Sequence, residues 1–591
     1  MLNFQINYQS FLVIVVILVQ TYVKAQVFVG ANTNVLVNNQ VFYVQQNLEL
    51  SVSSSNFYLR NQSQLLQGTT GTGANKGLGS LSIFQEGTVN NYQFNYWCSP
   101  VGNVALNTTI NNSFGINQLG VPITETTTTG ATILASNVYD GMANPFAIAP
   151  YWINKFTTNN TLYSDWVRVG ASATINAGEG FTMKGTSGTN TTTVYGVQNN
   201  PDGKHQRYDF RGKPNDGTIN IPVLLGEWTL TGNPYPSAIN LQEFLKNELN
   251  CTGVAYFWEQ DKSVNSHYLE DYKGGYATYS GGIDIYSPAI FYSYDGLGNQ
   301  IYSITSLGNS YKRKYSPVGQ GFMIEGLANS NVQMKNSYRV YVKEGAENSS
   351  QFEKRGINKT TAKTGGTPQI RFNTVLDNGP ISQMVLAFDS LSTDGVDRAM
   401  DAASPNDGPA NNYFVIDNNE YIIQVMPFDI DKKISIGFRN TAQANYKITV
   451  NEMLNIPEVT NVYIHNKVSN LFYNIKNSVF DITLPAGTNN TQYEVTFKNG
   501  NLGSNDFENH NNLVVRQDNV LKKLLIDNPF QKEIASCALY DVMGRLIFVK
   551  SQLGTEFSYT FSTSNLTDGI YIVKLATTDK SEIGLKIIVK N

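Results

Sequence analysis

Charged side chains are scarce in this sequence. Asp, Glu, Lys and Arg together make up only 15% of its 591 residues, and 42 basic against 46 acidic residues give a net charge of -4. So small and balanced a charge creates no broad basic field of the kind that attracts nucleic acid. We therefore expect no nucleic-acid partner and a surface made largely of uncharged polar groups.

Cysteine is also rare. The three cysteines, Cys98, Cys251 and Cys537, lie far apart and are odd in number, which does not fit a disulfide framework. No CxxC motif and no close pairing of Cys with His occurs, which disfavours a structural zinc site. We expect the three side chains to be buried thiols that pack as small hydrophobic groups.

Motifs for catalysis are missing. None of the four histidines lies in an HExxH motif, which disfavours zinc hydrolysis, and no serine lies in a G-x-S-x-G motif. We therefore predict no catalytic residue, and no cofactor unless calcium is one. A glycoside hydrolase stays open as an alternative, because sequence spacing does not reveal the separation of two carboxylates in space.

Only one long apolar run occurs, and it is N-terminal. Residues 11–19 (FLVIVVILV) are followed by Val23-Lys24-Ala25, a pattern typical of a signal-peptidase site. The run is about half as long as the roughly 20 apolar residues that span a bilayer. We predict a signal peptide over residues 1–25, cleavage after Ala25, and no transmembrane segment in the mature chain.

Aromatic, glycine and small polar residues are abundant. The chain has 34 Tyr, 30 Phe and 49 Gly, a composition that favours strands and turns. Apolar and polar residues alternate from residue 27 to about residue 67, which predicts strands joined by short turns. The glycine-rich segment 68–79 lacks the GKS or GKT ending of a phosphate-binding loop and is expected to be a plain loop.

Short motifs recur twice in the same order. YWCSP (96–100), PYW (150–152) and GEGF (178–181) are followed by GNPYP (232–236), YFW (256–258) and GQGF (319–322). We predict a β-rich region, residues 26–342, made of two related units at about 26–220 and 221–342. Within the second unit, a helix is expected at 237–249 with Ser237 as its cap.

The rest of the chain divides at two polar segments. Residues 343–366 and 499–514 lack apolar periodicity and are predicted to be linkers. Between them, short strands recur about every 8 to 12 residues, which predicts an antiparallel β-sandwich over 367–498. Residues 515–591 complete an all-β, multidomain chain as a small Ig-like β-sandwich.

The C-terminal segment contains several motifs in a fixed order: Asn528-Pro529, Tyr540-Asp541, Gly544-Arg545, Leu566 to Tyr571 with Lys574, and Lys586 to Lys590. It resembles the C-terminal sorting domain, type A-like, of Bacteroidetes proteins exported by the type IX secretion system. The motif residues of this resemblance are Pro529, Asp541, Gly544, Arg545, Leu566, Gly569, Tyr571, Lys574 and Lys590.

The resemblance implies the partners and the final location of the chain. These partners are the type IX secretion machinery and a sortase-like enzyme that removes the domain. The chain would then be released or attached to surface lipopolysaccharide. The preceding residues resemble large Flavobacterium-type secreted proteins, which adds architecture and habitat but no reaction.

Three tryptophans are candidates for facing a ligand: Trp97, Trp152 and Trp258. Aromatic rings offer flat apolar faces that suit sugars, although rings in strands also serve as core. In the loop 389–401 (DSLSTDGVDRAMD), we consider Asp394, Asp397 and Asp401 as calcium ligands. The spacing does not match an EF-hand, and a turn capped by Asp side chains is the alternative.

Together these features indicate an extracellular or cell-surface β protein. The favoured hypothesis is non-catalytic binding or adhesion to glycan, another cell or matrix. The alternatives are a surface polysaccharide hydrolase with unidentified carboxylates and a structural coat component.

Overall fold

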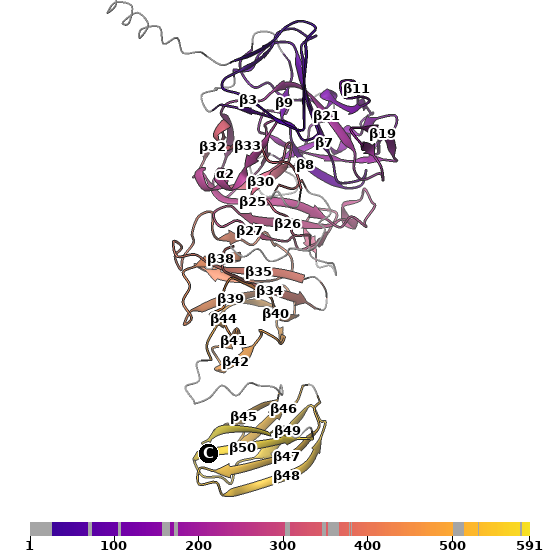
Figure 1. Ribbon diagram of the computed structural model, residues 1–591. Helices are drawn as coiled ribbons and strands as arrows, with labels where there is room; N and C mark the ends of the chain where they lie inside the picture. The colour runs from indigo at the N-terminus through magenta and orange to yellow at the C-terminus, as the bar shows by residue number, and fades with distance from the viewer. Residues whose placement is uncertain are drawn as a thin grey trace, which may run out of the picture. The chain divides into compact units, whose positions relative to one another are not determined.

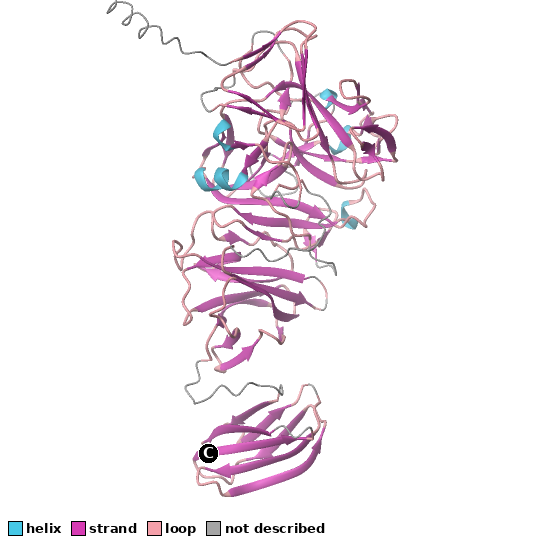
Figure 2. Ribbon diagram, in the orientation of Figure 1, coloured by secondary structure: helices cyan, strands magenta, loops and turns pink. Residues whose placement is uncertain are grey.

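The computed structural model describes residues 26–68, 74–104, 108–156, 166–170, 175–301, 308–345, 350–352, 366–377, 379, 381–499, 513–529, 531–578 and 582–590. Strands dominate these residues, which contain one short α-helix and a few 3-10 turns (Figure 1 and Figure 2). The predicted all-β class is confirmed. The predicted signal peptide and most of the two predicted linkers lie outside the described residues.

The chain forms two compact units, residues 1–500 and 501–591. The boundary between them lies within the predicted linker 499–514. Residues 26–342 and 367–498, predicted as separate regions, belong to one unit and share a hydrophobic core. Tyr256 and Met323 from the first range pack in this core with Phe372 and Ile423 from the second. The polar segment between the two ranges does not mark a break in the core, because apolar faces on both sides of it pack together.

The first strands stack in parallel as coils of a β-solenoid. They are β1 (Val27–Val29), β2 (Asn34–Asn38), β3 (Val41–Val44), β4 (Leu48–Leu50), β5 (Asn56–Arg60), β6 (Gln64–Gln67) and β7 (Ser80–Glu86). β1 pairs with β4, β2 with β5, β3 with β6, and β5 with β7, all in parallel. Alternate residues point inward, so that Val29 stacks on Leu50 and Val37 on Leu59.

The two halves of the predicted duplication follow the solenoid strands in the sequence. The first half contains β8 (Phe94–Cys98), β9 (Val101–Gly102), β10 (Leu119–Pro122), β11 (Thr128–Gly130), β12 (Thr132–Ile133), β13 (Gly141–Met142), β14 (Ala147–Ile148), β15 (Asn154–Phe156), β16 (Trp166–Arg168), β17 (Gly180–Lys184), β18 (Thr186–Ser187), β19 (Asn190–Val194), β20 (Val197–Asn200) and β21 (Arg207–Pro214). The second contains β22 (Ile219–Val223), β23 (Trp228–Gly232), β24 (Ala238–Asn240), α2 (Leu241–Asn247), β25 (Cys251–Gln260), β26 (Lys273–Ser280), β27 (Ile285–Ser287), β28 (Tyr292–Tyr294), β29 (Gln300–Ile301), β30 (Tyr315–Ser316), β31 (Gly321–Gly326), β32 (Ser330–Met334) and β33 (Arg339–Val340).

The repeated motifs occupy equivalent places in two antiparallel strand pairs. β8 pairs with β17 so that Cys98 lies opposite Gly180, and β23 pairs with β31 so that Gly232 lies opposite Gly321. The pairs approach each other so closely that a Cβ on Gly232 would lie 2.6 Å from the Cβ of Cys98. Glycine is needed there because a side chain would collide with the neighbouring strand pair.

The predicted helix begins later than the sequence suggests. Residues 238–240 are a strand, β24, which pairs with β30 and β33, and α2 covers only Leu241–Asn247. Its cap is Asn240, whose side chain accepts a hydrogen bond from the backbone amide of Glu243, rather than the predicted Ser237. The sheet uses the backbone groups that an earlier helical turn would need.

Residues 369–496 form one eleven-stranded sheet around the shared core. Its strands are β34 (Gln369–Leu376), β35 (Ile381–Phe388), β36 (Ala402–Ala403), β37 (Ala410–Ile416), β38 (Asn419–Met426), β39 (Lys433–Asn440), β40 (Ala444–Leu454), β41 (Tyr463–Asn466), β42 (Leu471–Asn474), β43 (Phe480–Leu484) and β44 (Gly487–Thr496). All pairs are antiparallel, as predicted, except β35 with β38. The strands are hydrogen-bonded as one sheet around the core, where the predicted sandwich has two.

The second unit is a small sandwich of two sheets with its own core. Its strands are β45 (Val514–Asp518), β46 (Lys523–Asp527), β47 (Ile534–Asp541), β48 (Leu546–Gly554), β49 (Ser558–Ser562), β50 (Gly569–Thr577) and β51 (Glu582–Val589). The sheet β45-β46-β49 packs on the sheet β48-β47-β50-β51. Cys537 lies in this core, and Cys98 and Cys251 are also buried and free, as predicted.

Candidate functional site

Half-buried aromatic rings pack at the margin of the shared hydrophobic core of the first unit. We define the aromatic strip as the five residues Phe156, Trp166, Trp228, Trp258 and Tyr276. They come from the neighbouring strands β15 and β16 and from the sheet that contains β23, β25 and β26. Side chains on alternate positions of a strand share one face of the sheet. On β25, one face packs on α2 and its core, and the face with Trp258 packs in part on the core shared with residues 369–496.

The rings of the strip contact each other directly and also pack on two buried tyrosines, Tyr96 and Tyr256. Trp228 stacks on Tyr256 with ring centroids 4.5 Å apart and planes 12° apart, and it meets the edge of Tyr276 at 5.0 Å. Trp258 contacts Tyr276 at 5.3 Å, and the Tyr276 hydroxyl lies 2.9 Å from that of Tyr96. The rings are held in place from below while part of each remains accessible.

Two of the three tryptophans singled out from the sequence are half-buried. Trp258 belongs to the strip and donates its indole N–H to Gln260 Oε1 at 3.0 Å. Trp152 lies at the end of a 3-10 turn and donates to the backbone oxygen of Tyr139 at 2.7 Å. Phe94 is edge-on to the Trp152 ring at 5.9 Å, which connects Trp152 with β8.

Trp97 does not face a ligand. Only 1% of its surface is exposed, and its indole packs against Tyr208, Phe210 and Phe352. It is next to Tyr96 on β8, and adjacent strand residues point to opposite sides of the sheet. Trp97 is therefore a core residue, contrary to the prediction.

A buried lysine lies beside Trp152. The Lys184 Nζ is 3.5 Å from the centre of the Trp152 ring and 3.0 Å from His267 Nδ1, and it donates to the Tyr272 hydroxyl. His267 Nε2 lies 2.9 Å from Asp140 Oδ1. We call these five residues the lysine cluster; they join the first repeat to the loop 261–272 of the second.

Burial controls protonation in the lysine cluster. Removal from water lowers the pKa of the Lys184 ammonium to about 6, against an opposing effect of the Asp140 carboxylate. Burial and the nearby lysine also lower the pKa of His267. Lys184 is 5% exposed, so it positions the loop and the Trp152 ring and does not itself offer a broad contact surface.

The carboxylates proposed for calcium bond to separate groups. Asp394 forms an ion pair with Lys432, and Asp397 accepts from the hydroxyl of Thr393 at 3.1 Å. Asp401 accepts backbone amides from Asp397 at 2.6 Å and from Val425 at 2.7 Å. Within the described ranges, no three acidic, histidine or cysteine side chains converge in a way that could hold a metal ion. Calcium binding stays a prediction, and these contacts favour the alternative of a capped turn.

The same loop docks onto the second repeat. Arg398 Nη1 donates to the backbone oxygens of Leu245 and Cys251, each at 3.0 Å, and so binds carbonyls at the end of α2. The Ala399 amide donates to the Thr252 oxygen at 2.8 Å. The acidic side chains thus shape a loop that connects two parts of the first unit.

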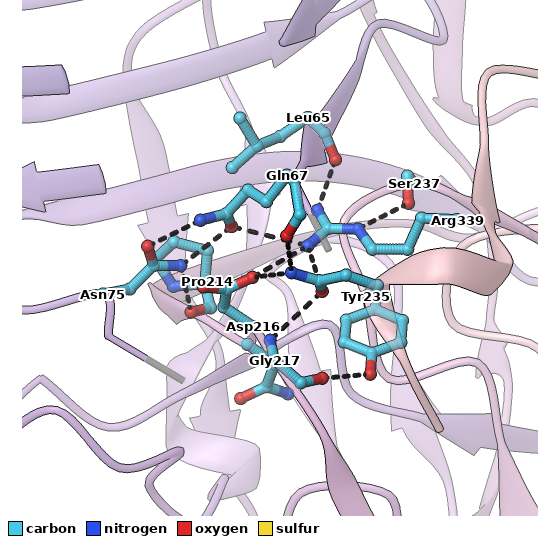
Figure 3. A network of polar contacts seen from close by, with 12 residues as sticks. Leu65, Gln67, Asn75, Pro214, Asp216, Gly217, Tyr235, Ser237 and Arg339 are labelled. Atoms are coloured by element: carbon cyan, nitrogen blue, oxygen red, sulfur yellow. Dashed lines mark hydrogen bonds and ion pairs between the residues drawn. The ribbon is translucent and has the colours of Figure 1, made fainter. Parts of the chain in front are cut away.

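A buried polar network joins the solenoid to both repeats (Figure 3). Arg339 Nη1 lies 3.3 Å from Asp216 Oδ1, and both side chains are at most 1% exposed. Asn336 donates to the same Asp216 oxygen at 2.7 Å, and Arg339 donates to the backbone oxygen of Leu65. Such a pair is stabilising only while both charges are matched, which gives the network a structural role.

The motif residues of the second unit build its turns and core. Asp541 Oδ1 accepts the amides of Met543 at 3.0 Å and Arg545 at 2.9 Å, and the Asp541 carboxylate also pairs with the Arg545 guanidinium at 3.0 Å. These hydrogen bonds lower the pKa of Asp541. Gly544 has φ of +78°, which glycine adopts without strain.

The remaining motif residues lie at strand ends or in the core. Tyr571 is buried and donates to the backbone oxygen of Thr567 at 3.0 Å, while Leu566 packs on the core. Gly569 opens β50, which also contains Lys574, and Lys590 follows β51. Pro529 is an exposed turn residue after β46.

Exposed apolar side chains lie on the larger sheet of this unit. Ile570 and Ile572 of β50 are 39% and 40% exposed, and Ile588 of β51 is 61% exposed. Ile570 lies opposite Ile588 in the strand pairing. An uncovered apolar patch of this kind is typical of a surface that another protein contacts.

Several residues of the candidate site were not predicted. Trp166 and Trp228 were missed because ordinary alternation gives no sign of which residues at the margin of a shared core keep part of their surface exposed. Lys184 had a detectable signal: it closes the otherwise uncharged strand GFTMK, where an ionisable group needs specific partners. Arg398 had none, because its contacts are with backbone oxygens remote in sequence.

Two family models match the sequence. One, described as a domain of unknown function, DUF8693, matches residues 7–497. The other, described as a secretion system C-terminal sorting domain, matches residues 521–590. A search of curated proteins gave no match. None of the helices in the described ranges has the length and apolar character needed to cross a membrane.

Solved structures are similar only at a low level. A DUF3244 family protein with an immunoglobulin-like β-sandwich fold from Bacteroides vulgatus is 12% identical, with 15% of this chain and 93% of that chain covered and a TM-score of 0.13. The CupB2 chaperone of Pseudomonas aeruginosa is 14% identical, with 39% of this chain and 90% of that chain covered and a TM-score of 0.11. The BSP domain of a biofilm associated protein is 9% identical, with 86% of this chain and 96% of that chain covered and a TM-score of 0.13.

Proposed function

The chain belongs to the family of the domain of unknown function DUF8693, and we propose that this family domain is a non-catalytic binding module that contacts glycan at the cell surface. A type IX C-terminal sorting domain follows it at residues 521–590, so the protein is exported to the cell surface or beyond. The proposal concerns what the exported first unit does there.

The aromatic strip is the observation that carries this proposal. Sugars bind to proteins through the flat faces of aromatic rings, and three of the five tryptophans of the chain lie in the strip. Buried tyrosines fix these rings, which reduces the conformational entropy lost on binding. A large ligand would therefore meet a preformed surface.

A single carboxyl group lies next to Trp228 in the strand pairing. Glu325 is opposite Trp228, and burial raises its pKa. Glycoside hydrolysis ordinarily needs two carboxyl groups about 5 to 9.5 Å apart. Glu325 by itself does not supply such a pair.

Affinity electrophoresis on a panel of polysaccharides tests the proposal. We expect at least one polysaccharide to retard the protein, with no release of reducing sugar from the same panel. Release of reducing sugar would replace the proposal with the hydrolase alternative. Free migration on every polysaccharide, together with self-assembly into sheets or fibres, would instead favour the coat component.

We also propose that the sorting domain is removed after export by a sortase-like enzyme. The chain would then be released or joined to surface lipopolysaccharide. Mass spectrometry of both ends, on protein from washed cells and from medium, tests this step. A mature chain that begins at Gln26 and ends before about Leu521 is expected, whereas an intact C-terminal domain would contradict the processing.

A further inference from the structure

The first coil of the solenoid, residues 26–47, has free strand edges on all three sides. β1, β2 and β3 pair with the second coil on one edge, and no described strand pairs with the opposite edge. An unpaired edge offers a row of backbone donors and acceptors to another chain. Solenoids ordinarily need a polar cap at such an end.

The apolar core is open at this end. Val27, Val35 and Phe42 of the first coil are only partly buried. The residues on which they stack in the second coil, Leu48, Phe57 and Leu65, are at most 1% exposed. These three inward positions are thus partly uncovered at the first coil, while the other inward residues, Val29, Val37 and Val44, stay buried.

The usual devices that block edge pairing are missing from this coil. Residues 26–47 contain no Asp, Glu, Lys, Arg or Pro. The outward side chains are uncharged: Phe28, Leu36 and Tyr43 are 63%, 40% and 58% exposed, and Asn34 and Asn38 flank Leu36 on β2. The nearest cation is Lys343, whose Nζ donates to Asn39 Oδ1 at 2.6 Å at one corner. Two identical coils would therefore meet without charge repulsion along their strands.

We infer that the first coil is a self-association surface, on which a second copy of this chain seats end to end. A twofold axis through the middle of β2 places β2 against the partner's β2 and β1 against the partner's β3. All three pairs then run antiparallel, because the strands circle the solenoid in opposite senses when its ends face each other. Such an isologous contact is self-complementary and closes at a dimer.

Sedimentation equilibrium of the chain from Gln26 to Asn591 tests the inference. We expect a concentration-dependent dimer whose dissociation constant is insensitive to salt. Leu36→Lys should raise that constant at least about tenfold, because it sets two cations side by side at the axis. Val197→Lys is the matched control: Val197 is also 40% exposed in a strand, β20, and its substitution should leave the dimer unchanged.

A cross-link provides a readout that does not depend on charge. Leu36→Cys should form a disulfide between copies on mild oxidation, since the three native cysteines are buried, and Val197→Cys should not. A monomer at all concentrations, or equal dimerisation of both lysine variants, would overturn the inference. The chain that retains residues 1–25 provides a further comparison. If it stays monomeric while the chain from Gln26 dimerises, the inference is supported, because that segment would then compete for the same edge.

Discussion

The indole of Trp228 lies parallel to the ring of Tyr256, with centroids 4.5 Å apart and planes inclined by 12°. Tyr256 is buried, so it fixes the half-buried Trp228 in one orientation on the aromatic strip. Trp228→Ala and Trp258→Ala should each weaken retention on a retarding polysaccharide roughly three- to tenfold. Tyr268→Ala is the control, because Tyr268 is 71% exposed but lies outside the strip. Equal effects of all three substitutions would argue against the strip as the binding surface.

Replacement of the buried lysine should alter the dependence of stability on pH. The pKa of Lys184 is lowered to about 6, far below that of an unfolded lysine, so the unfolded chain takes up the proton between these values. The free energy of unfolding of the native protein should thus rise with pH from 7 to 10. Lys184→Met removes that contribution. From pH 7 to 10, the free energy of unfolding of the variant should rise by roughly 1 to 4 kcal/mol less than that of the native protein.

Urea titrations at several pH values measure this difference. The window above pH 7 avoids the titration of His267, whose own pKa is lowered. Asp140 and Tyr272 are the other titratable groups in the cluster, and both remain in the variant. Parallel curves for the two proteins would contradict a neutral Lys184 in the folded state.

Loss of one partner of the buried ion pair should destabilise the first unit strongly. Arg339→Met leaves the Asp216 carboxylate buried without its counterion, at a cost of roughly 3 to 5 kcal/mol. Adding Asp216→Asn should recover part of that loss, since the uncompensated charge is removed. The urea midpoint of the unfolding transition of the first unit is the measurement.

An exposed pair provides the control for this experiment. Lys498 and Asp431 lie 2.6 Å apart, with side chains 53% and 67% exposed. Lys498→Ala should cost at most about 1 kcal/mol. A similar loss for Arg339→Met and Lys498→Ala would mean that the buried network contributes no more than a surface contact.

Calcium should leave the melting temperature of the full chain unchanged. Asp394 is paired with Lys432, and Asp397 and Asp401 accept hydrogen bonds from nearby groups, which favours the capped turn. Burial also raises the pKa of Asp401 to about 7, which disfavours the ionised form that a metal needs. Differential scanning calorimetry in chelator and in millimolar calcium measures the effect. A higher melting temperature in calcium than in chelator, abolished by Asp397→Asn, would establish the predicted site.

Disruption of the Asp541 turn should impair export. Asp541→Ala removes the acceptor of two backbone amides and the partner of Arg545. We expect less protein on washed cells and in medium, and more inside the cell. Asp295→Ala is matched, because Asp295 caps a similar turn in the first unit through the amides of Leu297 and Asn299. Deletion of residues 521–591 should abolish export, and normal secretion of that deletion would contradict the role of the sorting domain.

Local patterns in the sequence were enough for the strand-rich class, the buried thiols and the turn chemistry of the C-terminal motif. Alternation of apolar residues requires only neighbours along the chain, and Asp541 and Gly544 form their turn with residues four or fewer positions away. The repeated motifs also predicted two related β units, and in the structure each unit has an antiparallel strand pair with a motif glycine, Gly180 in the first and Gly321 in the second.

Tertiary structure alone decided which faces are covered. Trp97 and Tyr96 are adjacent in sequence, yet the former is core and the latter lies beneath the aromatic strip, because neighbouring strand residues point to opposite sides. The parallel stacking of the solenoid and the core shared across residues 343–366 depend on contacts between distant segments, which no local pattern encodes. Asn240 caps the helix in place of Ser237 because β30 and β33 pair with residues 238–240 and use the intervening backbone groups.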